Sequence, residues 1–173
     1  MEYRFEVTRK IRQLWRREDG SALTELAILI PLLAVMLAAV CEFGRYFQNY
    51  NTLAKATRTA SRYLSNHKLT TQEMGRAQNL VVCGKLTCGQ SDKAQLSGLS
   101  AANVCIETTG SPKVTSVTVR IPRATTPCTP TAGAGNASPL VYKPIFNIGA
   151  LLGSSLSMNL PIAPRTTMYY MID

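Results

Sequence analysis

The longest apolar stretch of the chain covers residues 26–41, where Pro31 is the one residue that a helix interior disfavours. Glu25 and Glu42 bound this run. Counted from Ser21, the segment 21–41 would form a helix of about 32 Å, close to the roughly 30 Å hydrocarbon core of a bilayer. The pattern therefore predicts one membrane-spanning helix over residues 21–41, with a kink at Pro31.

The helical pattern continues beyond the apolar run. Apolar and small residues recur at three- and four-residue steps between residues 43 and 64, while the basic residues take other faces. This periodicity predicts an amphipathic stalk helix over residues 42–66, whose apolar stripe is the seam on which an outer domain packs. The stripe comprises Phe43, Tyr46, Phe47, Tyr50, Leu53, Ala54, Thr57, Ala60, Ser61 and Leu64. The aromatic residues between 43 and 50 also suit the outer interface of a membrane.

Residues 67–173 change from helical to strand patterns. A second helix is expected over residues 71–82, started by Thr70 or Thr71 and ended by Gly84. Two β-branched segments, residues 104–108 and 114–121, flank a turn at 109–112 and predict a hairpin.

The C-terminal third is expected to contain a loop, a short helix and further strands. The proline-rich segment 122–139 reads as a loop pinned by Cys128, and residues 140–152 as a short helix after Pro144. Alternation over residues 156–162, and the segment 167–172, predict strands. The fold class is therefore α+β, with a long N-terminal helix packed on a small antiparallel sheet.

Composition and charge narrow the class of protein. The chain is 46% apolar and 17% charged, which is too hydrophobic for a disordered protein. Six basic residues face four acidic ones within residues 1–20, which favours a cytoplasmic N-terminus and an outward-facing C-terminal part. The net charge of +9 comes from scattered residues without a nucleic-acid-binding motif, so we expect no specific nucleic-acid partner.

Several fates are possible for a basic leader followed by an apolar run. Signal peptidase requires small residues at the end of the run, but Cys41 is followed by Glu42 and Phe43. A lipoprotein signal requires a small residue before the cysteine, where Val40 stands. Neither fits well, which leaves a retained anchor or a different kind of processing.

Four segments carry a resemblance to a known family. The first is the junction Gly20-Ser21-Ala22-Leu23-Thr24-Glu25, where a glycine ends the charged leader and a glutamate follows five residues later. The others are ELAILIPLL at 25–33, EFGR at 42–45 and ATRTASRY at 56–63. Over about residues 17–65 the chain resembles the TadE-like minor pilins of tight-adherence (Tad) pili.

The resemblance implies a pilin-like fold and a specific maturation. A prepilin peptidase would cut between Gly20 and Ser21 on the cytoplasmic side of the bacterial inner membrane and leave the outer domain in the periplasm. By analogy with pilins, Glu25 would then pair with the N-terminal amine of a neighbouring pilin subunit. The alternative is that Glu25 merely lies among the lipid headgroups where the span begins.

Four of the five cysteines lie in the predicted outer domain, and an even number suits two disulfides in an oxidising compartment. Four cysteines allow three connectivities, of which we prefer Cys83 with Cys88 and Cys105 with Cys128. The alternative is a zinc site, but the spacing is not that of paired CxxC motifs and no histidine lies nearby. We therefore expect no metal, and Cys41 is left over at the membrane edge.

Catalytic constellations are not evident in the sequence. His67 is the only histidine and stands in a polar stretch, which favours a solvated side chain. Gly84-Lys85 lacks the remaining residues of a phosphate-binding loop. We expect a protein without enzymatic activity or cofactor.

The sequence thus predicts a cytoplasmic leader (1–20), a transmembrane helix (21–41), a stalk helix (42–66) and an α+β domain (67–173). The predicted function is that of a minor subunit in the assembly of a Tad-type pilus, with prepilin peptidase, other pilins and inner-membrane lipid as partners. The first alternative is an uncleaved single-pass protein whose outer domain binds another envelope protein. The second is a secreted, disulfide-stapled enzyme with a removable signal.

Overall fold

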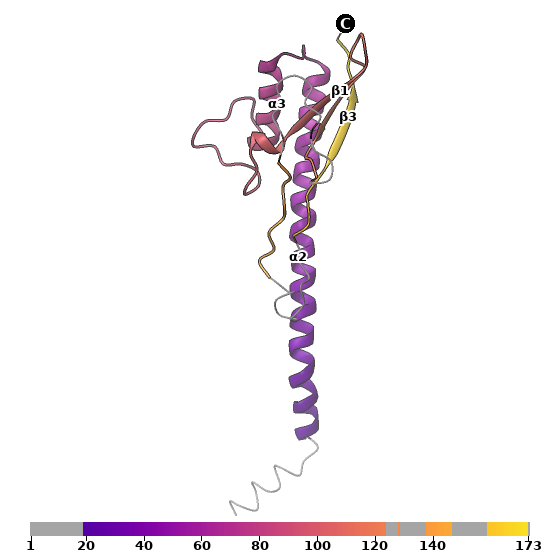
Figure 1. Cartoon of the computed structure of the whole chain (residues 1–173). Coiled ribbons are helices and arrows are strands. Elements are labelled where there is room, and N and C mark those ends of the chain that lie inside the picture. Colours follow the sequence, from indigo (N-terminus) through magenta and orange to yellow (C-terminus); the bar gives the residue numbers. More distant parts are fainter. Residues whose placement is uncertain (1–18, 124–127, 129–137, 147–158, 173) are drawn as a thin grey trace, which may run out of the picture. The chain divides into compact units, whose positions relative to one another are not determined.

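The computed structural model describes residues 19–123, 128, 138–146 and 159–172 (Figure 1). The chain divides into two compact units, Met1–Cys41 and Glu42–Asp173. The described elements, in chain order, are α2 (Asp19–Ser65), α3 (Thr71–Cys83), the 3-10 helix η1 (Ala101–Asn103), β1 (Cys105–Thr109), β2 (Ser116–Arg120) and β3 (Arg165–Tyr169).

The described part of the first unit is the N-terminal portion of α2, which continues through Pro31. Its large apolar side chains are exposed, including Leu23, Ile28, Leu32, Leu37 and Val40. α2 is long and apolar enough to cross a membrane, with a mean hydropathy of 2.5 over its most apolar window. An exposed apolar surface of this extent would be unfavourable in water, so it fits a lipid environment.

The second unit has one hydrophobic core, to which the C-terminal part of α2 contributes a fully buried stripe. Leu53, Ala60 and Leu64 are completely buried, at helical spacings of seven and four residues. α3 adds Ala77 and Val81, and the sheet and its flanking segments complete the same core with Ile106, Val117, Val119, Ile121 and Ile162. The C-terminal part of α2 and the described strands therefore lie in one compact unit.

α3 has the ends that the sequence predicts. The Thr70 side chain accepts a hydrogen bond from the Glu73 backbone N–H at 3.3 Å, which caps the helix N-terminus. Gly84 ends the helix with φ of 75° and donates its N–H to the Leu80 carbonyl, a conformation that favours glycine.

The sheet has three antiparallel strands in the order β1-β2-β3. Ile106, Val119 and Thr166 occupy the same position across the three strands, so they share one face. That face meets α2, because the Thr57 hydroxyl lies 3.2 Å from the Thr166 hydroxyl and Ser61 donates to the Thr166 carbonyl at 3.1 Å. The predicted arrangement of a helix on a small antiparallel sheet is confirmed.

The opposite face of the sheet is polar. The Thr118 and Thr167 hydroxyls lie 2.8 Å apart on neighbouring strands. Arg120 on β2 pairs with Glu107 on β1 at 2.6 Å. Charged and hydroxyl pairs of this kind stabilise strand pairing while the apolar face remains buried against the helix.

The predicted hairpin is present, but its turn is longer than expected. β1 ends at Thr109 and β2 begins at Ser116, and the Thr115 N–H closes the turn on the Thr109 carbonyl. Gly110 has a φ of 117°, and a Cβ there would collide with the backbone of Lys113. A glycine is therefore required at this position of the turn.

One prediction for the C-terminal third is wrong in the described residues. Residues 159–162 hold a single bridge, between Pro161 and Val141, instead of a strand. Proline explains this difference, since Pro161 and Pro164 lack the N–H that a ladder needs. Residues 145–146 form a bend, and the rest of the helix expected after Pro144 lies outside the described residues, as does most of the predicted loop. The final strand, β3, starts two residues earlier than expected.

The cysteines lie in pairs. The Cα atoms of Cys83 and Cys88 are 6.2 Å apart, and those of Cys105 and Cys128 are 5.9 Å apart, with each pair at disulfide distance. These are the pairs that the sequence analysis preferred. Cys41 is exposed and free.

If both pairs are bridged in the protein made in an oxidising compartment, alkylation without reductant should label Cys41 alone, as read by peptide mass spectrometry. Each Cys→Ser variant should expose its own partner, so that Cys105→Ser makes Cys128 reactive and leaves Cys83 and Cys88 protected. Labelling of Cys83 or Cys88 in that variant would show a different connectivity.

Candidate functional site at the ends of the apolar segment

Two glutamates flank the apolar segment of α2, and the structure places them in opposite environments. Glu25 is exposed, and no ion pair or hydrogen bond of its carboxylate is found among the described residues. Glu42 is 1% exposed. A carboxylate buried in an apolar setting costs free energy unless it is hydrogen-bonded. Glu42 therefore needs hydrogen-bond donors from the fold, whereas the exposed Glu25 does not.

The N-terminal end of the segment holds the predicted cleavage site. Gly20 and Ser21 lie in the first turn of α2 and are exposed, and the Thr24 hydroxyl donates to the Ser21 carbonyl at 2.8 Å. Ser21 and Glu25 are four residues apart, which puts them on one face of the helix.

Gly20 has no packing role in the described part of the chain. A Cβ built there would meet nothing within 4 Å. Glycine also disfavours a helix by about 1 kcal/mol relative to alanine, so local stability does not explain its presence. A requirement for glycine at this position would therefore come from a partner outside the fold.

Glu42 is held at the other end of the segment by residues far along the chain. Its Oε1 atom accepts hydrogen bonds from the Tyr142 hydroxyl at 2.8 Å and from the Ile145 backbone N–H at 2.7 Å. Its Oε2 atom lies 3.6 Å from the half-exposed Arg45 guanidinium, which permits an ion pair but is too long for a hydrogen bond. Glu42 thus fastens the segment 138–146 to α2 immediately beyond Cys41.

Tyr142 is the main partner of this carboxylate. Its ring packs edge-on against that of Tyr46, with centroids 5.6 Å apart, and its backbone N–H binds the Leu160 carbonyl. Burial, together with the hydrogen bond to Glu42, raises the pKa of the Tyr142 hydroxyl above its ordinary value. The tyrosine therefore remains a donor at neutral and moderately alkaline pH.

Glu42 was expected to end the apolar run and to form part of the EFGR segment, but its buried role was not predicted. The signal was present in the spacing. Counting from Glu42 in steps of four and three reaches Tyr46, then residue 49, then the buried Leu53, Thr57, Ala60 and Leu64. By contrast Phe43 and Phe47, which the analysis placed in the packing stripe, are exposed. Tyr142 carried no comparable signal, because its contact with Glu42 joins positions 100 residues apart.

The other residues considered for chemistry, His67 and Lys85, make contacts within the fold. The His67 ring stacks on that of Tyr63, and its Nδ1 lies 2.7 Å from the Tyr63 carbonyl, just after the end of α2. Lys85 pairs with Asp92 at 2.6 Å. Among the residues that the structure describes, no three His, Cys, Asp or Glu side chains are grouped so that they could hold a metal ion.

These features define a class of protein in which one apolar helix that could span a membrane leads into an α+β unit built on its C-terminal half. The model of the family described as TadE-like protein matches residues 20–62. The resemblance to TadE-like proteins is therefore confirmed, and it covers α2 from its second residue to its last turn, including Glu25 and Glu42. The TadE-like family is a structural, non-enzymatic type associated with Tad pili. No curated protein and no solved structure shows significant similarity to the chain.

The Glu42–Tyr142 hydrogen bond should contribute measurably to the free energy of unfolding. Tyr142→Phe removes the donor and leaves part of a buried carboxylate unsatisfied, so it should lower the free energy of unfolding by about 1 kcal/mol or more. The variant should be compared with the wild type by urea-dependent pulse proteolysis in detergent micelles. Tyr169→Phe, at an exposed position on β3, is the matched control and should have no effect.

The same bond predicts a dependence on alkaline pH. Because the folded-state pKa of Tyr142 is raised, its stabilising contribution is complete below the unfolded value of about 10 and is lost as the pH rises through the folded value. The difference between wild type and Tyr142→Phe should shrink over that range. A difference that stays constant would contradict the assignment of Tyr142 as the donor.

Proposed function

We propose that the protein is a pilin-like minor subunit that takes part in assembling a Tad-type pilus and is processed between Gly20 and Ser21 by a prepilin peptidase. It is held in the bacterial inner membrane by residues 21–41, with its N-terminus cytoplasmic and the unit from Glu42 onward in the periplasm. The family match supports the association with Tad pili. The exposed Glu25 carboxylate is the observation that carries the more specific role.

Glu25 supports an assembly role because its partner has to come from outside the described part of the chain. A carboxylate costs about 2.5–3.5 kcal/mol at the centre of a bilayer, and ionisable groups inside spans are functional candidates for that reason. The other glutamate of the segment, Glu42, has its hydrogen bonds within its own unit. Glu25 lacks such donors among the described residues.

The amine created by cleavage is a chemically suitable partner. Cutting after Gly20 converts the Ser21 nitrogen from an amide into a charged ammonium at the start of the helix. A Glu25 carboxylate from one subunit and a Ser21 amine from the next would neutralise each other in a low-dielectric environment, where an unpaired charge of either sign is strongly disfavoured. Such a pairing favours one axial register between neighbouring helices.

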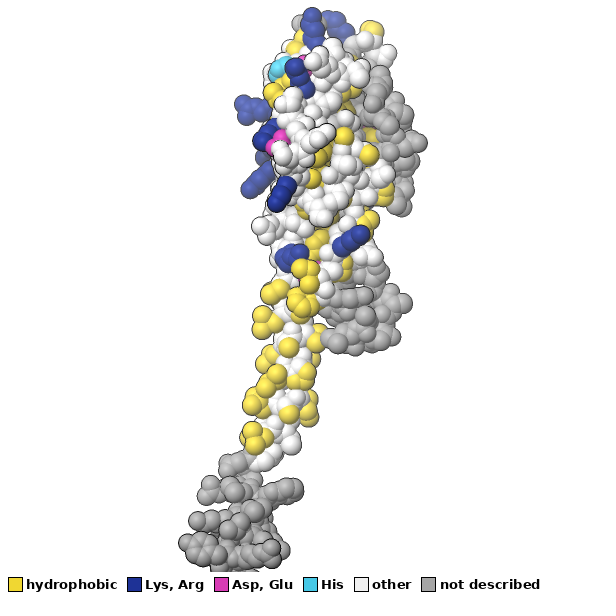
Figure 2. All heavy atoms as spheres, turned by 90° about the vertical axis from the view of Figure 1, so that its left-hand side faces the viewer, with side chains coloured by type: hydrophobic (Ala, Val, Ile, Leu, Met, Phe, Trp, Pro, Cys, Tyr) yellow, Lys and Arg dark blue, Asp and Glu magenta, His cyan; other side chains and the backbone are white. Residues whose placement is uncertain are grey.

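Figure 2 is consistent with this division of roles. On the face shown, apolar side chains cover the N-terminal part of α2, while lysine and arginine side chains lie over the unit that begins at Glu42. Basic residues of that unit on α2 include Arg45, Lys55, Arg58 and Arg62. The N-terminal part of α2 thus has a surface suited to lipid or to other helices, and its C-terminal part has a surface suited to water.

Processing should depend on Gly20. Gly20→Ala should insert into the membrane normally but keep an intact N-terminus when a prepilin peptidase is co-expressed, because the fold itself tolerates a Cβ there. Intact-mass measurement of the membrane-extracted protein gives the readout. Gly44→Ala, which also adds a methyl group into open space on α2, is the matched control and should be cut to a Ser21 start. A wild-type protein that keeps Met1 with the peptidase present would favour an uncleaved membrane-anchored protein instead.

Assembly should depend on the Glu25 charge. Glu25→Ala and Glu25→Gln should be inserted and processed, yet fail to restore pili in a strain that lacks the native protein, as judged by electron microscopy and by pilin in the sheared fraction. Leu29→Ala, one turn further on the same exposed face, keeps the charge and should restore pili. Normal piliation with Glu25→Gln would remove the proposed role of the carboxylate.

A further inference from the structure

We propose that the segment 141–146 is a second membrane-contacting element, which rests on the boundary between the lipid headgroups and acyl chains and is held there by Glu42. This inference depends on the membrane-spanning part of the proposed function, and not on cleavage or on pilus assembly. It assigns lipid as the partner of apolar side chains that are exposed in the described part of the unit.

The segment exposes large apolar side chains next to an ordered backbone. Ile145 is 66% exposed and Phe146 is 50% exposed, whereas Tyr142 in the same segment is buried in the core. The backbone is fixed on one side by the Ile145 N–H bond to Glu42 and on the other by the Tyr142 N–H bond to the Leu160 carbonyl. The exposed side chains are thus presented by a fastened segment.

Covalent geometry puts this segment at the end of the predicted span. Glu42 follows Cys41 directly, so their Cα atoms are about 3.8 Å apart across the peptide bond. Ile145 lies within hydrogen-bonding distance of the Glu42 side chain, at 2.7 Å from its Oε1. An element attached to the first residue beyond a membrane span lies where the hydrocarbon core meets the headgroups.

The same part of α2 carries further apolar side chains that are largely exposed. Phe43 is 64% exposed and Phe47 is 63% exposed, one helical turn apart. Aromatic residues are enriched at membrane interfaces because their rings fit the headgroup region. Phe43, Phe47, Ile145 and Phe146 therefore form one membrane-facing set, contributed by two segments that Glu42 joins.

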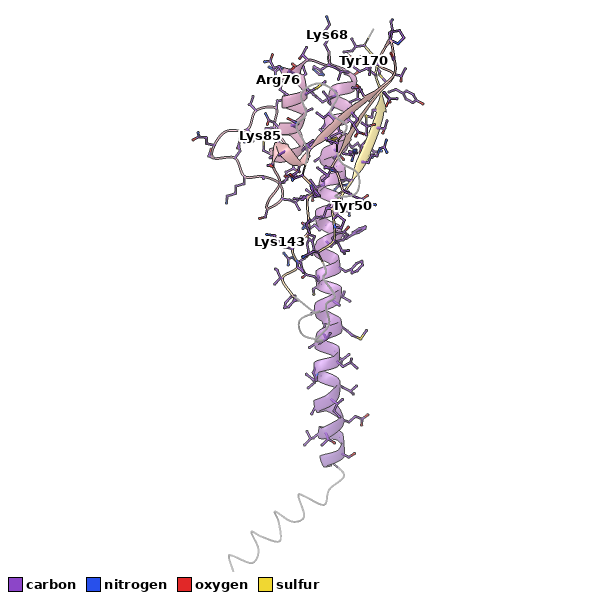
Figure 3. The ribbon with its side chains drawn as sticks, in the orientation of Figure 1. Tyr50, Lys68, Arg76, Lys85, Lys143 and Tyr170 are labelled. Carbon is purple, nitrogen blue, oxygen red and sulfur yellow. A yellow bond between two sulfur atoms is a disulfide. The ribbon has the colours of Figure 1, made fainter. Side chains whose placement is uncertain are left out.

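Cations flank this set. Lys143 is exposed and projects from the segment beside α2, as Figure 3 shows, and Arg45 is half exposed on the helix. Each lysine or arginine close to an anionic bilayer surface contributes about 1 kcal/mol of attraction. The acidic residue at this level, Glu42, is buried and presents no repulsive charge to the headgroups. The chemistry matches an anionic phospholipid surface better than a second, equally basic copy of the chain.

Depth-dependent fluorescence quenching tests the proposal. Trp15 is the only tryptophan, so a Trp15→Phe background allows a single reporter to be placed by Phe146→Trp. The full chain would be reconstituted in nanodiscs of phosphatidylcholine and phosphatidylglycerol, with and without bromine on the upper acyl-chain carbons. Met36→Trp in the predicted span reports insertion, and Tyr169→Trp on exposed β3 reports a position away from lipid.

We expect the Phe146→Trp emission to be blue-shifted relative to Tyr169→Trp and to be quenched by brominated lipid. Adding Tyr142→Phe should weaken that quenching, because it removes one of the two bonds that fasten the segment to Glu42. Water-like, unquenched emission from Phe146→Trp alongside quenched Met36→Trp would overturn the inference while leaving the span intact. Blue-shifted but unquenched emission would overturn it in favour of a contact with another subunit. If Met36→Trp is also unquenched, the membrane-spanning part of the proposed function fails with it.

Discussion

The packing of one face of α2 against the sheet is the interaction on which the unit Glu42–Asp173 depends. Leu53, Ala60 and Leu64 are fully buried on that face, and the small residues between them let the sheet approach closely enough for Ser61 to reach the Thr166 carbonyl. The described sheet has three short strands, and its apolar face has to be buried against another element to form a core. The helix therefore supplies what the sheet lacks, and the C-terminal strand β3 has to return to it to complete the unit.

The two glutamates show how one helix can be used in two ways. Glu42 has its partners in its own unit, where its carboxylate accepts hydrogen bonds that hold α2 to a segment 100 residues away. Glu25 has no such donors among the described residues, and the proposed function gives it a partner on a neighbouring subunit. Identical side chains at the two ends of one apolar run therefore have opposite environments, which differ in exposure and in the hydrogen-bond donors described around them.

Local chemistry explains which parts of the fold could be predicted from the sequence. The bounds of α3 follow from Thr70 and Gly84, and the hairpin follows from alternating β-branched residues around a glycine-containing turn. The segment 159–162 was mispredicted as a strand because its conformation depends on long-range bonds with residues 140–142 and on prolines that interrupt a ladder. For the candidate site, the apolar segment and Glu25 could be identified and the spacing placed Glu42 on the buried face, whereas its partner Tyr142, 100 residues away, could not be predicted.

A membrane-seated surface and a filament-forming helix place competing demands on the same residues. If the chain is anchored as proposed, Phe43 and Phe47 would lower the free energy of the system by contacting lipid, and the segment 141–146 would add to that apolar area. A subunit that enters a filament has to exchange those lipid contacts for contacts with neighbouring helices. Because both environments are apolar, the exchange costs little in hydrophobic free energy, and the net preference then rests on polar groups. The proposed pairing of Glu25 with a neighbouring amine would be available only in the filament, so that single charge would bias an otherwise balanced equilibrium.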